Sequence, residues 1–479
     1  MKRPLPTLVL LFCLAFAASA ADLPDLGDVA VVEFSPAQER QIGEEIMREV
    51  RRDPAWFDDP ETEEYINRLG QRLAAASADP SRRFEFFVVR NGTLNAFALP
   101  GGYIGVHSGL ILAAQSESEL AGVLGHEIGH VTQRHIAQLI GKQKQLGAIM
   151  LASLLAALAA NDSRATEAAL AVGAAGTMQA QLAYTRDFER EADRAGLQTL
   201  EAAGFDVRGM AGFFSRLQRA SRLYENNAPA YLRTHPLTTE RIADMENRVM
   251  SARYRQTPDS ADFRYVQARL HARALPAADG VRTFADLAGK NPDDMALRYG
   301  LALAQLRLGR LNEAAQSVEE LRRRAEPSPF VAILDAELDS VRRNYDAAIK
   351  TLTAASRKFP SSKSVVYALL EAQIVGGRAS DAEQSARRAL VGKGGDIRLW
   401  QLLSRANAAL GKRTAQHRAQ AEVYMLQGAY RAATEQLELA RKTGDGDFYE
   451  LSAADARLHE IRDRMRDELK RERKSERER

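Results

Sequence analysis

In residues 117–135, apolar side chains recur every three or four positions. This period predicts an α-helix that buries one of its sides. Ser116, followed three residues later by Glu119, has the capping-box pattern with which helices begin, so the helix is expected to start at this point. The apolar positions are Leu120, Val123, Leu124, Ile128 and Val131.

The preceding segment predicts two more helices and a small sheet. Ser35 followed by Pro36 is typical of a helix start. Proline is confined to sheet edges, so the strands beside Pro100-Gly101-Gly102 are expected to include an edge strand. An extended peptide can add to such an edge; an ordinary hairpin without a ligand is the alternative. The expected elements are helices over 35–52 and 60–76, a strand over 83–89 and two short strands within 95–106.

In the second half of the chain the pattern changes to pairs of helices. Alanine-rich segments around Ala314, Ala347 and Ala382 recur at intervals of 33 and 35 residues. A period near 34 with helix–turn–helix content is typical of tetratricopeptide repeats, whose stacked pairs present a concave protein-binding face. Tyr430 repeats the pattern after a longer interval, so an extra helix or a broken repeat is expected around residues 415–425.

Residues 146–182 are apolar over most of their length. One interpretation is a buried helical hairpin. The other is a mobile lid, or a patch that makes at most peripheral contact with a membrane or an unfolded client. No run after the first 20 residues reaches the roughly 20 apolar residues of a transmembrane helix, so we expect a soluble, exported protein.

Residues 1–20 have the pattern of a secretory signal peptide. A basic start and an apolar core precede Ala18-Ser19-Ala20, which fits a signal peptidase site, so cleavage is expected near Ala20. The single cysteine, Cys13, lies in this segment, and the mature protein therefore has no disulfides. The net charge of the 479 residues is only +3, which gives no reason to expect nucleic-acid binding.

The helix of residues 117–135 contains the H-E-x-x-H motif of His126, Glu127 and His130. Residues four apart on a helix lie on the same side, so the two imidazoles can converge on one Zn²⁺. Glu127 can take a proton from the zinc-bound water. His135 lies about 140° around the helix from His130 and is expected at the surface as long as the helix continues.

Catalytic zinc needs a third protein ligand and a position open to water. The segment from Tyr184 to Leu197 offers Glu189 as that ligand. Asp193, one turn further on, is placed to accept the second N–H of a histidine ligand, whereas Glu191 points nearly the opposite way. A solvated acidic helix face is the alternative.

The zinc helix, the E-x-x-x-D segment and N-A-F-x-x-P-G-G from Asn95 resemble the CAAX-prenyl-protease and HtpX peptidase family of glutamate-zincins, over roughly residues 35–250. The resemblance implies that His126, His130 and Glu189 bind zinc and that Glu127 is the catalytic acid/base. It also implies an active-site role for Asp193, often that of a proton donor. With its signal peptide and repeats, the chain is similar to the periplasmic β-barrel assembly-enhancing protease branch.

The family's H-P-x-x-x-x-R pattern matches His235 to Arg241. Either side chain can stabilise the oxyanion of peptide hydrolysis if it lies near the open zinc position. A second hypothesis is that His235 fills that position and holds the enzyme inactive until a client displaces it. A packed loop histidine is the third interpretation.

The expected fold is an α+β zincin-like metallopeptidase domain, mostly helical with a small sheet, followed by an all-α tetratricopeptide-repeat solenoid. The expected function is zinc-dependent peptide cleavage in the periplasm. The resemblance implies that the substrates are misassembled outer-membrane proteins and that the repeats bind these clients or the barrel assembly machinery. A chaperone or scaffold with a latent zinc site is the alternative. The expected boundaries are 1–20 for the signal peptide, 21–255 for the peptidase, 262–456 for the repeats and 457–479 for a charged tail.

Overall fold

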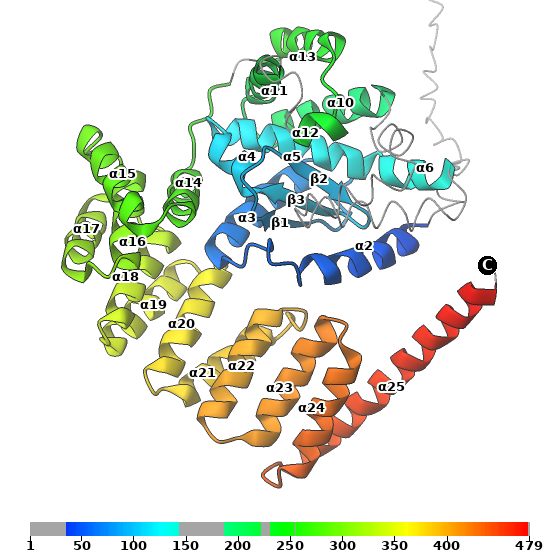
Figure 1. The fold of residues 1–479 in the computed structure, drawn as a ribbon, viewed down its shortest axis with the longest axis vertical. Helices are drawn as coiled ribbons and strands as arrows, with labels where there is room; N and C mark the ends of the chain where they lie inside the picture. Colours follow the sequence, from blue (N-terminus) through cyan, green and yellow to red (C-terminus); the bar gives the residue numbers. More distant parts are fainter. Residues whose placement is uncertain (1–34, 143–185, 222–229, 254, 478–479) are drawn as a thin grey trace, which may run out of the picture.

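The computed structural model describes residues 35–142, 186–221, 230–253 and 255–477. Residues 35–253 form a sheet-containing half, and residues 255–477 form an array of helices that we call the repeat half (Figure 1). The expected signal peptide and the apolar stretch 146–182 lie outside the described residues. Among the helices that are described, none has the length and apolar character needed to cross a lipid bilayer.

The sheet has three strands, as the pattern predicts, and their order is β1-β3-β2. β3 lies in the middle, parallel to β1 and antiparallel to β2, so β2 is an edge strand. Gly102 ends the turn between β2 and β3 with φ of 89°, and a Cβ at this position would lie 2.1 Å from the carbonyl oxygen of Arg83. The strands are β1 (Glu85–Val89), β2 (Ala96–Leu99) and β3 (Tyr103–His107).

Alternating strand residues give the sheet two apolar faces. Helix α2 (Pro36–Val50) covers one face with Ile46, Met47 and Val50, against Phe87, Val89, Phe97 and Leu99. Helices α3 (Pro60–Ala75) and α5 (Glu117–Thr132) belong to the core on the other face, with Phe86, Val88, Ile104 and Val106. The sheet is therefore the middle layer, and α5 is buried along nearly its whole length.

Helix α5 starts at the predicted place, because the Ser116 side chain accepts a hydrogen bond from the Glu119 backbone N–H. It ends earlier than the pattern predicts. Arg134 adopts the left-handed conformation with φ of 55°, and a new helix, α6 (His135–Lys142), begins one residue later. The side chain of Arg134 holds this turn by donating to Glu39 of α2 at 2.9 Å.

Helix α10 (Arg186–Ala202) packs directly on α5 at glycines. A Cβ on Gly196 would lie 2.9 Å from the backbone nitrogen of His126, and one on Gly129 would lie 2.8 Å from the carbonyl oxygen of Ala192. Only glycine permits this approach, which brings the side chains of both helices together. The remaining helices of this half are α4 (Ser108–Ala113), α11 (Arg208–Ser221), α12 (Ala230–Thr234) and α13 (Thr239–Ser251).

The repeat half keeps a period of 34. After α14 (Ala261–Ala274) and α15 (Ala277–Lys290), the first helices of successive pairs start at residues 295, 329, 363 and 397, and the second helices at 311, 345, 379 and 413. The pairs are α16 (Met295–Arg307) and α17 (Leu311–Arg324), α18 (Pro329–Val341) and α19 (Tyr345–Lys358), α20 (Lys363–Val375) and α21 (Ala379–Leu390), and α22 (Ile397–Ala409) and α23 (Arg413–Leu426).

A helix covers residues 415–425, as one of the two predicted alternatives states, and it is the additional helix that lengthens the interval before Tyr430. These residues belong to α23, the second helix of a regular pair, and Tyr430 starts α24 (Tyr430–Lys442), the first helix of the next pair. The alanine pattern of a second helix recurs there in a first helix, which shifted the apparent period by half a repeat.

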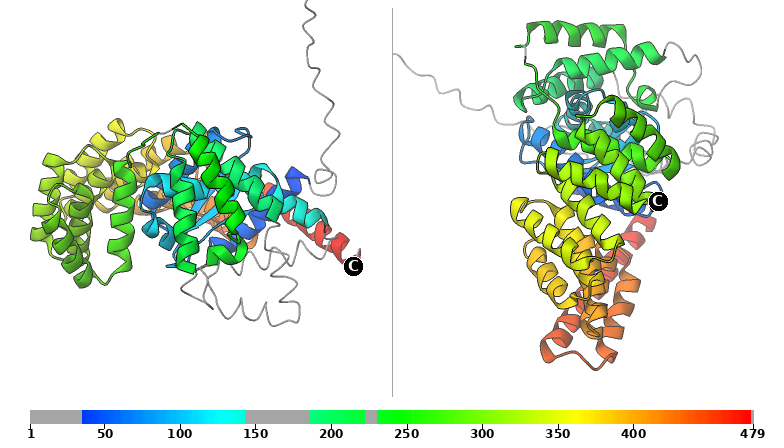
Figure 2. Two further views of the ribbon diagram at one scale, coloured as in Figure 1. Left: turned by 90° about the horizontal axis from the view of Figure 1, so that it is seen from above. Right: turned by 90° about the vertical axis from the view of Figure 1, so that its left-hand side faces the viewer.

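The last helix is longer than the expected tail. Helix α25 runs from Phe448 to Arg477, so the boundary predicted at residue 457 falls inside it. Leu458 and Ile461 are buried against residues of α23 and α24, such as Met425 and Leu437. The first turns of the predicted tail are therefore part of the repeat core, and the remainder of α25 projects from the end of the array (Figure 2).

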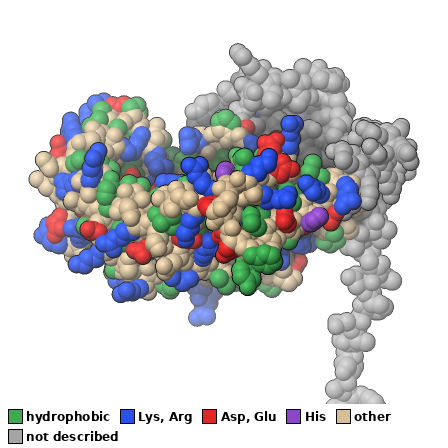
Figure 3. All heavy atoms as spheres, turned by 90° about the horizontal axis from the view of Figure 1, so that it is seen from below, with side chains coloured by type: hydrophobic (Ala, Val, Ile, Leu, Met, Phe, Trp, Pro, Cys, Tyr) green, Lys and Arg blue, Asp and Glu red, His purple; other side chains and the backbone are tan. Residues whose placement is uncertain are grey.

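The two halves meet along the amino-terminal end of α3. Glu64 accepts hydrogen bonds from Ser362 Oγ and from the backbone N–H of Ser364 at the start of α20. The array then curves beneath α2, where Arg52 donates to the carbonyl oxygen of Gln427 at 3.2 Å (Figure 1). Viewed from below, the surface carries interspersed charges of both signs (Figure 3).

Candidate metal centre

His126 and His130 lie on one side of α5 and are fully buried. Their Nε2 atoms approach to 3.0 Å, so both lone pairs can be directed at one point. From α10, the Glu189 carboxylate reaches the same point, with oxygens 3.5 Å from His126 Nε2 and 3.4 Å from His130 Nε2. The structure thus brings the three predicted ligands together.

His235 completes the cluster from the other side. It follows α12 directly, and its Nδ1 lies 3.0 Å from Glu189 Oε1. One donor atom from each of His126, His130, Glu189 and His235 lies within 4.8 Å of the other three. Three imidazoles and one carboxylate are a donor set that suits tetrahedral Zn²⁺, so these residues fit the metal that the motif predicts.

Glu127 is the buried carboxylate next to this cluster. Its side chain is fully buried, and neither oxygen has a hydrogen-bond partner among the described side chains. The Nε2 atom of His235 lies 3.6 Å from Glu127 Oε1. Burial raises the pKa of Glu127 above its ordinary value, and a water molecule or a substrate amine is the kind of group that such a carboxylate can serve.

Asp193 and Arg241 support the cluster from behind. Asp193 Oδ1 lies 3.0 Å from His126 Nδ1, as predicted, which leaves His126 Nε2 free to face a metal. Arg241 donates to both oxygens of Asp193, at 2.7 and 2.8 Å. It also pairs with Glu189 at 2.6 Å and donates to the carbonyl oxygen of Pro236.

These contacts favour a positioning role for Arg241 over the oxyanion role that the sequence allows for it or for His235. All three guanidinium nitrogens of Arg241 are engaged, and its side chain is 2% exposed. Its guanidinium therefore orients the two carboxylates.

The electrostatics of the cluster follow from these pairs. Burial opposes ionisation of Glu189, but His235 and hydrogen bonds from the two α5 histidines hold its pKa well below the ordinary value. Burial also disfavours the charged form of His126, yet the hydrogen bonds to Asp193 and Glu189 raise its pKa to about 9. Binding of a divalent cation must displace that proton.

His135 is not at the surface, contrary to the prediction. Because α5 ends at Thr132 and Arg134 turns the chain, the His135 ring is fully buried. Its Nδ1 lies 2.9 Å from His130 Nδ1, and its Nε2 lies 3.1 Å from Glu191 on α10. Sequence reasoning assumed an unbroken helix and so missed this contact.

Comparison with known proteins places the chain in a family. The pattern of peptidase family M48 matches residues 60–249, and tetratricopeptide repeat patterns match residues 265–329 and 337–397. The β-barrel assembly-enhancing protease of Escherichia coli is 33% identical over 94% of this chain and 93% of its own length. The chain belongs to peptidase family M48.

Other relatives of this M48 peptidase agree. A putative β-barrel assembly-enhancing protease of Vibrio cholerae is 35% identical over 89% of this chain and 91% of its own length. A mitochondrial metalloendopeptidase of Schizosaccharomyces pombe is 31% identical over 41% of this chain and 56% of its own length. The chain is therefore a metalloprotease with a peptidase domain followed by tetratricopeptide repeats, as its sequence predicts.

Tyr231 is a further residue of the M48 peptidase site that sequence reasoning missed. Its ring is fully buried, 4.6 Å from the ring of His235 and 6.3 Å from that of His126. The backbone N–H of His235 donates to the carbonyl oxygen of Tyr231, so the two side chains share one side of a helical turn. The sequence signal that could have identified Tyr231 is its position four residues before His235, because this spacing places two side chains on one side of a helix.

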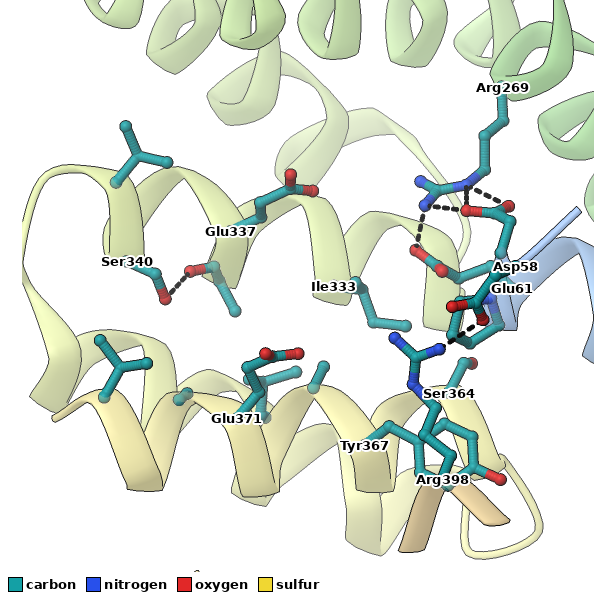
Figure 4. Close-up of a pocket in the computed structure, with 18 of the residues that line it drawn as sticks. Asp58, Glu61, Arg269, Ile333, Glu337, Ser340, Ser364, Tyr367, Glu371 and Arg398 are labelled. Carbon is teal, nitrogen blue, oxygen red and sulfur yellow. Dashed lines mark hydrogen bonds and ion pairs between the residues drawn. The ribbon is translucent and has the colours of Figure 1, made fainter. Parts of the chain in front are cut away.

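The M48 peptidase also has a groove of about 450 Å³ between its two halves. Arg269 lies at one end, bound to Asp59 and Glu61 of the sheet-containing half, and Asp58 pairs with Arg398 nearby (Figure 4). Helices α18, α19 and α20 of the repeat half line much of the rest, and α18 and α20 contribute apolar side chains and two carboxylates. These residues are Ile333, Ala336, Glu337, Val341, Glu371, Ala372 and Val375.

Proposed function

We propose that this M48 peptidase is a zinc-dependent endopeptidase of the bacterial periplasm that degrades misassembled outer-membrane proteins and aids their assembly. The observation that carries the catalytic part is the convergence of four buried donors beside the buried Glu127. The names of the enterobacterial and Vibrio relatives support the β-barrel clients. The signal-peptide pattern of residues 1–20 supports the compartment.

In this proposal His126, His130 and Glu189 hold the zinc ion. When bound, the ion polarises the scissile carbonyl and acidifies a water molecule. Glu127 accepts the proton of that water and passes it to the leaving nitrogen, a task for which burial has raised its pKa in the right direction. Asp193 holds the tautomer of His126, and Arg241 fixes Asp193.

The edge strand β2 is the proposed substrate platform. The His107 backbone N–H donates to the carbonyl oxygen of Asn95, and ladder pairs alternate along an antiparallel strand. The backbone groups of Phe97 and Leu99 therefore form hydrogen bonds with β3. The backbone N–H and C=O groups of Ala96 and Ala98 point to the open edge. An extended peptide bound there adds a strand beside α5, close to Glu127.

The position of His235 supports an inactive resting state. Catalytic zinc keeps one coordination position open, but here a fourth donor stands beside the other three. We propose that His235 fills this position and that a client displaces it. A filled position also favours the second candidate function, which is that of a chaperone or scaffold with a latent zinc site.

One substitution, compared with a control, separates the peptidase function from the scaffold function. Glu127→Gln is expected to keep the metal and to reduce casein hydrolysis by the mature protein at least about 100-fold. Glu201→Gln, an exposed position on α10, is the matched control and should leave hydrolysis unchanged. If Glu127→Gln fully supports envelope assembly in cells, the scaffold function is favoured over proteolysis.

His235→Ala tests the resting state in the same assay. If His235 closes the site, basal casein hydrolysis should rise; if His235 instead stabilises the transition state, hydrolysis should fall. Unchanged hydrolysis would contradict both roles. The double variant His235→Ala/Glu127→Gln should be inactive, which shows that any added activity comes from this site.

The groove between the halves is the proposed client site of the repeats. Val341 and Val375 lie at the ends of its facing helices and are 52% and 53% exposed, so they offer apolar contact to an unfolded chain. Replacing both with lysine should weaken binding of an unfolded outer-membrane protein several-fold while casein hydrolysis is retained. Met250→Lys, exposed but outside the groove, is the control.

A further inference from the structure

The two α5 histidines, His126 and His130, have different partners at their Nδ1 atoms. His126 rests on the Asp193 carboxylate, which lies 3.0 Å from its Nδ1. At Nδ1 of His130 lies a second imidazole, that of His135, at 2.9 Å. His135 in turn meets the carboxylate of Glu191 at 3.1 Å. His130 is thus supported by a chain of two residues instead of one.

The direction of the protons in this chain is fixed by chemistry. His130 can bind a metal through Nε2 only if its ring proton is on Nδ1. That N–H must then donate to His135 Nδ1, so His135 carries its own proton on Nε2 and donates it to the Glu191 carboxylate. With the opposite order, the proton of His130 would sit on Nε2 and block the metal.

The surroundings hold His135 in this orientation. Its ring stacks on Phe188 with centroids 4.4 Å apart and an angle of 9° between the planes. The left-handed turn at Arg134, tied to Glu39, sets where α6 begins and therefore where His135 stands. Glu191 lies on α10, the helix that also carries Glu189, and its side chain is 52% exposed.

We propose that His135 and Glu191 are positioning residues that fix the metal-binding tautomer and orientation of His130. This role rests on the proposed zinc peptidase, and nothing in the H-E-x-x-H motif itself requires it. This chain of hydrogen bonds explains why His135 is buried next to His130. It also explains why the half-exposed Glu191 carboxylate points toward His135. Outer partners of this kind typically change metal affinity about 10- to 100-fold.

The test measures zinc affinity of the mature protein by competition with a chromophoric chelator. Glu191→Ala and His135→Phe should each bind zinc about 10- to 100-fold more weakly than the wild type. His135→Phe keeps the ring that stacks on Phe188 and removes both nitrogens. Glu191→Gln keeps an acceptor oxygen and should restore most of the affinity, and Glu201→Ala on the same helix should match the wild type.

Two further readouts distinguish positioning from general destabilisation. The visible spectrum of the Co²⁺-substituted protein should shift in Glu191→Ala and His135→Phe but not in Glu201→Ala. Thermal unfolding of the metal-free protein should be nearly unchanged in Glu191→Ala, because that side chain is about half exposed. Zinc affinity within about twofold of wild type in both variants would overturn the inference. A wild-type protein that binds no zinc would instead overturn the proposed function.

Discussion

The metal centre and the outer surface of the repeat half differ in how deeply their ion pairs are buried. Around the metal centre, Asp193, Glu189 and Arg241 form ion pairs of 2.6 to 2.8 Å with side chains that are at most 3% exposed. In the repeat half, pairs such as Arg431–Glu435 lie in solvent, with side chains 91% and 61% exposed. Buried charges are costly to desolvate, whereas exposed pairs cost and contribute little.

Helix composition follows the same division. All residues of α5 from Glu117 to Val131 are buried, including the motif histidines. Helix α19, by contrast, buries only Ala348, Ile349, Leu352 and Ala355 of its 14 residues. The metalloprotease half is thus built around groups that chemistry requires, and the repeat half around a small apolar seam that recurs every 34 residues.

Removing the buried cation should cost far more stability than removing an exposed one. Arg241→Met leaves Asp193 and Glu189 buried without their partner and should lower the free energy of unfolding by about 3–5 kcal/mol. Arg431→Met should change it by less than about 0.5 kcal/mol. Denaturant unfolding of both metal-free variants measures the difference. Equal losses would show that the metal centre is not more dependent on its ion pairs than the repeats are.

Glu63, where the halves meet, should give a pH-dependent effect. Burial and the charge of Glu85 raise the pKa of Glu63 from 4.5 to about 7. Because its pKa is higher in the folded protein, the stability it contributes is complete below about pH 4.5 and is lost as the pH rises through about 7. Glu63→Gln cannot ionise, so it should be more stable than wild type at pH 8, by about 1–2 kcal/mol, and nearly equal at pH 4.

The measurement is denaturant unfolding of wild type and Glu63→Gln across this pH range. Glu201→Gln, an exposed substitution, should show no such trend. A stability difference that is larger at pH 4 than at pH 8 would contradict the direction of the pKa shift.

The smallest effect concerns two arginines with left-handed backbones. Arg343 occupies the turn position that Gly309, Gly377 and Gly411 fill in the other repeats, with φ of 63°, and its side chain is exposed. Arg343→Gly should therefore raise the free energy of unfolding by about 0.5–1 kcal/mol. In the metalloprotease half, Arg134→Gly relieves the same strain but loses the ion pair with the buried Glu39, so it should be neutral or destabilising.

Parallel denaturation curves of the two variants decide this comparison. A stabilised Arg134→Gly together with an unchanged Arg343→Gly would reverse the expected order. Such a result would mean that the Glu39 pair does not hold the turn before His135.

Local patterns were sufficient to predict much of the fold. Ser116 and Glu119 predicted the start of α5, and Pro100 to Gly102 predicted the break between two strands. The period near 34 predicted the repeats. These features could be predicted because caps, turns and helix faces depend on residues close in sequence. The spacing of His126, Glu127 and His130 likewise fixes the chemistry of one helix side. Glu189 and Asp193 could be proposed because they share one side of a second helix.

Features that depend on contacts between residues far apart in the sequence could not be predicted from local patterns. An unbroken helical period put His135 at the surface, but the turn at Arg134 is set by Glu39, 95 residues earlier, and places His135 against His130 and Glu191. The sequence allowed an oxyanion role for Arg241, but only the structure shows its contacts with Asp193, Glu189 and Pro236. The fourth donor, His235, enters the cluster only because α10 and the segment after α12 are packed on the same side of α5, and such packing is a property of the assembled chain.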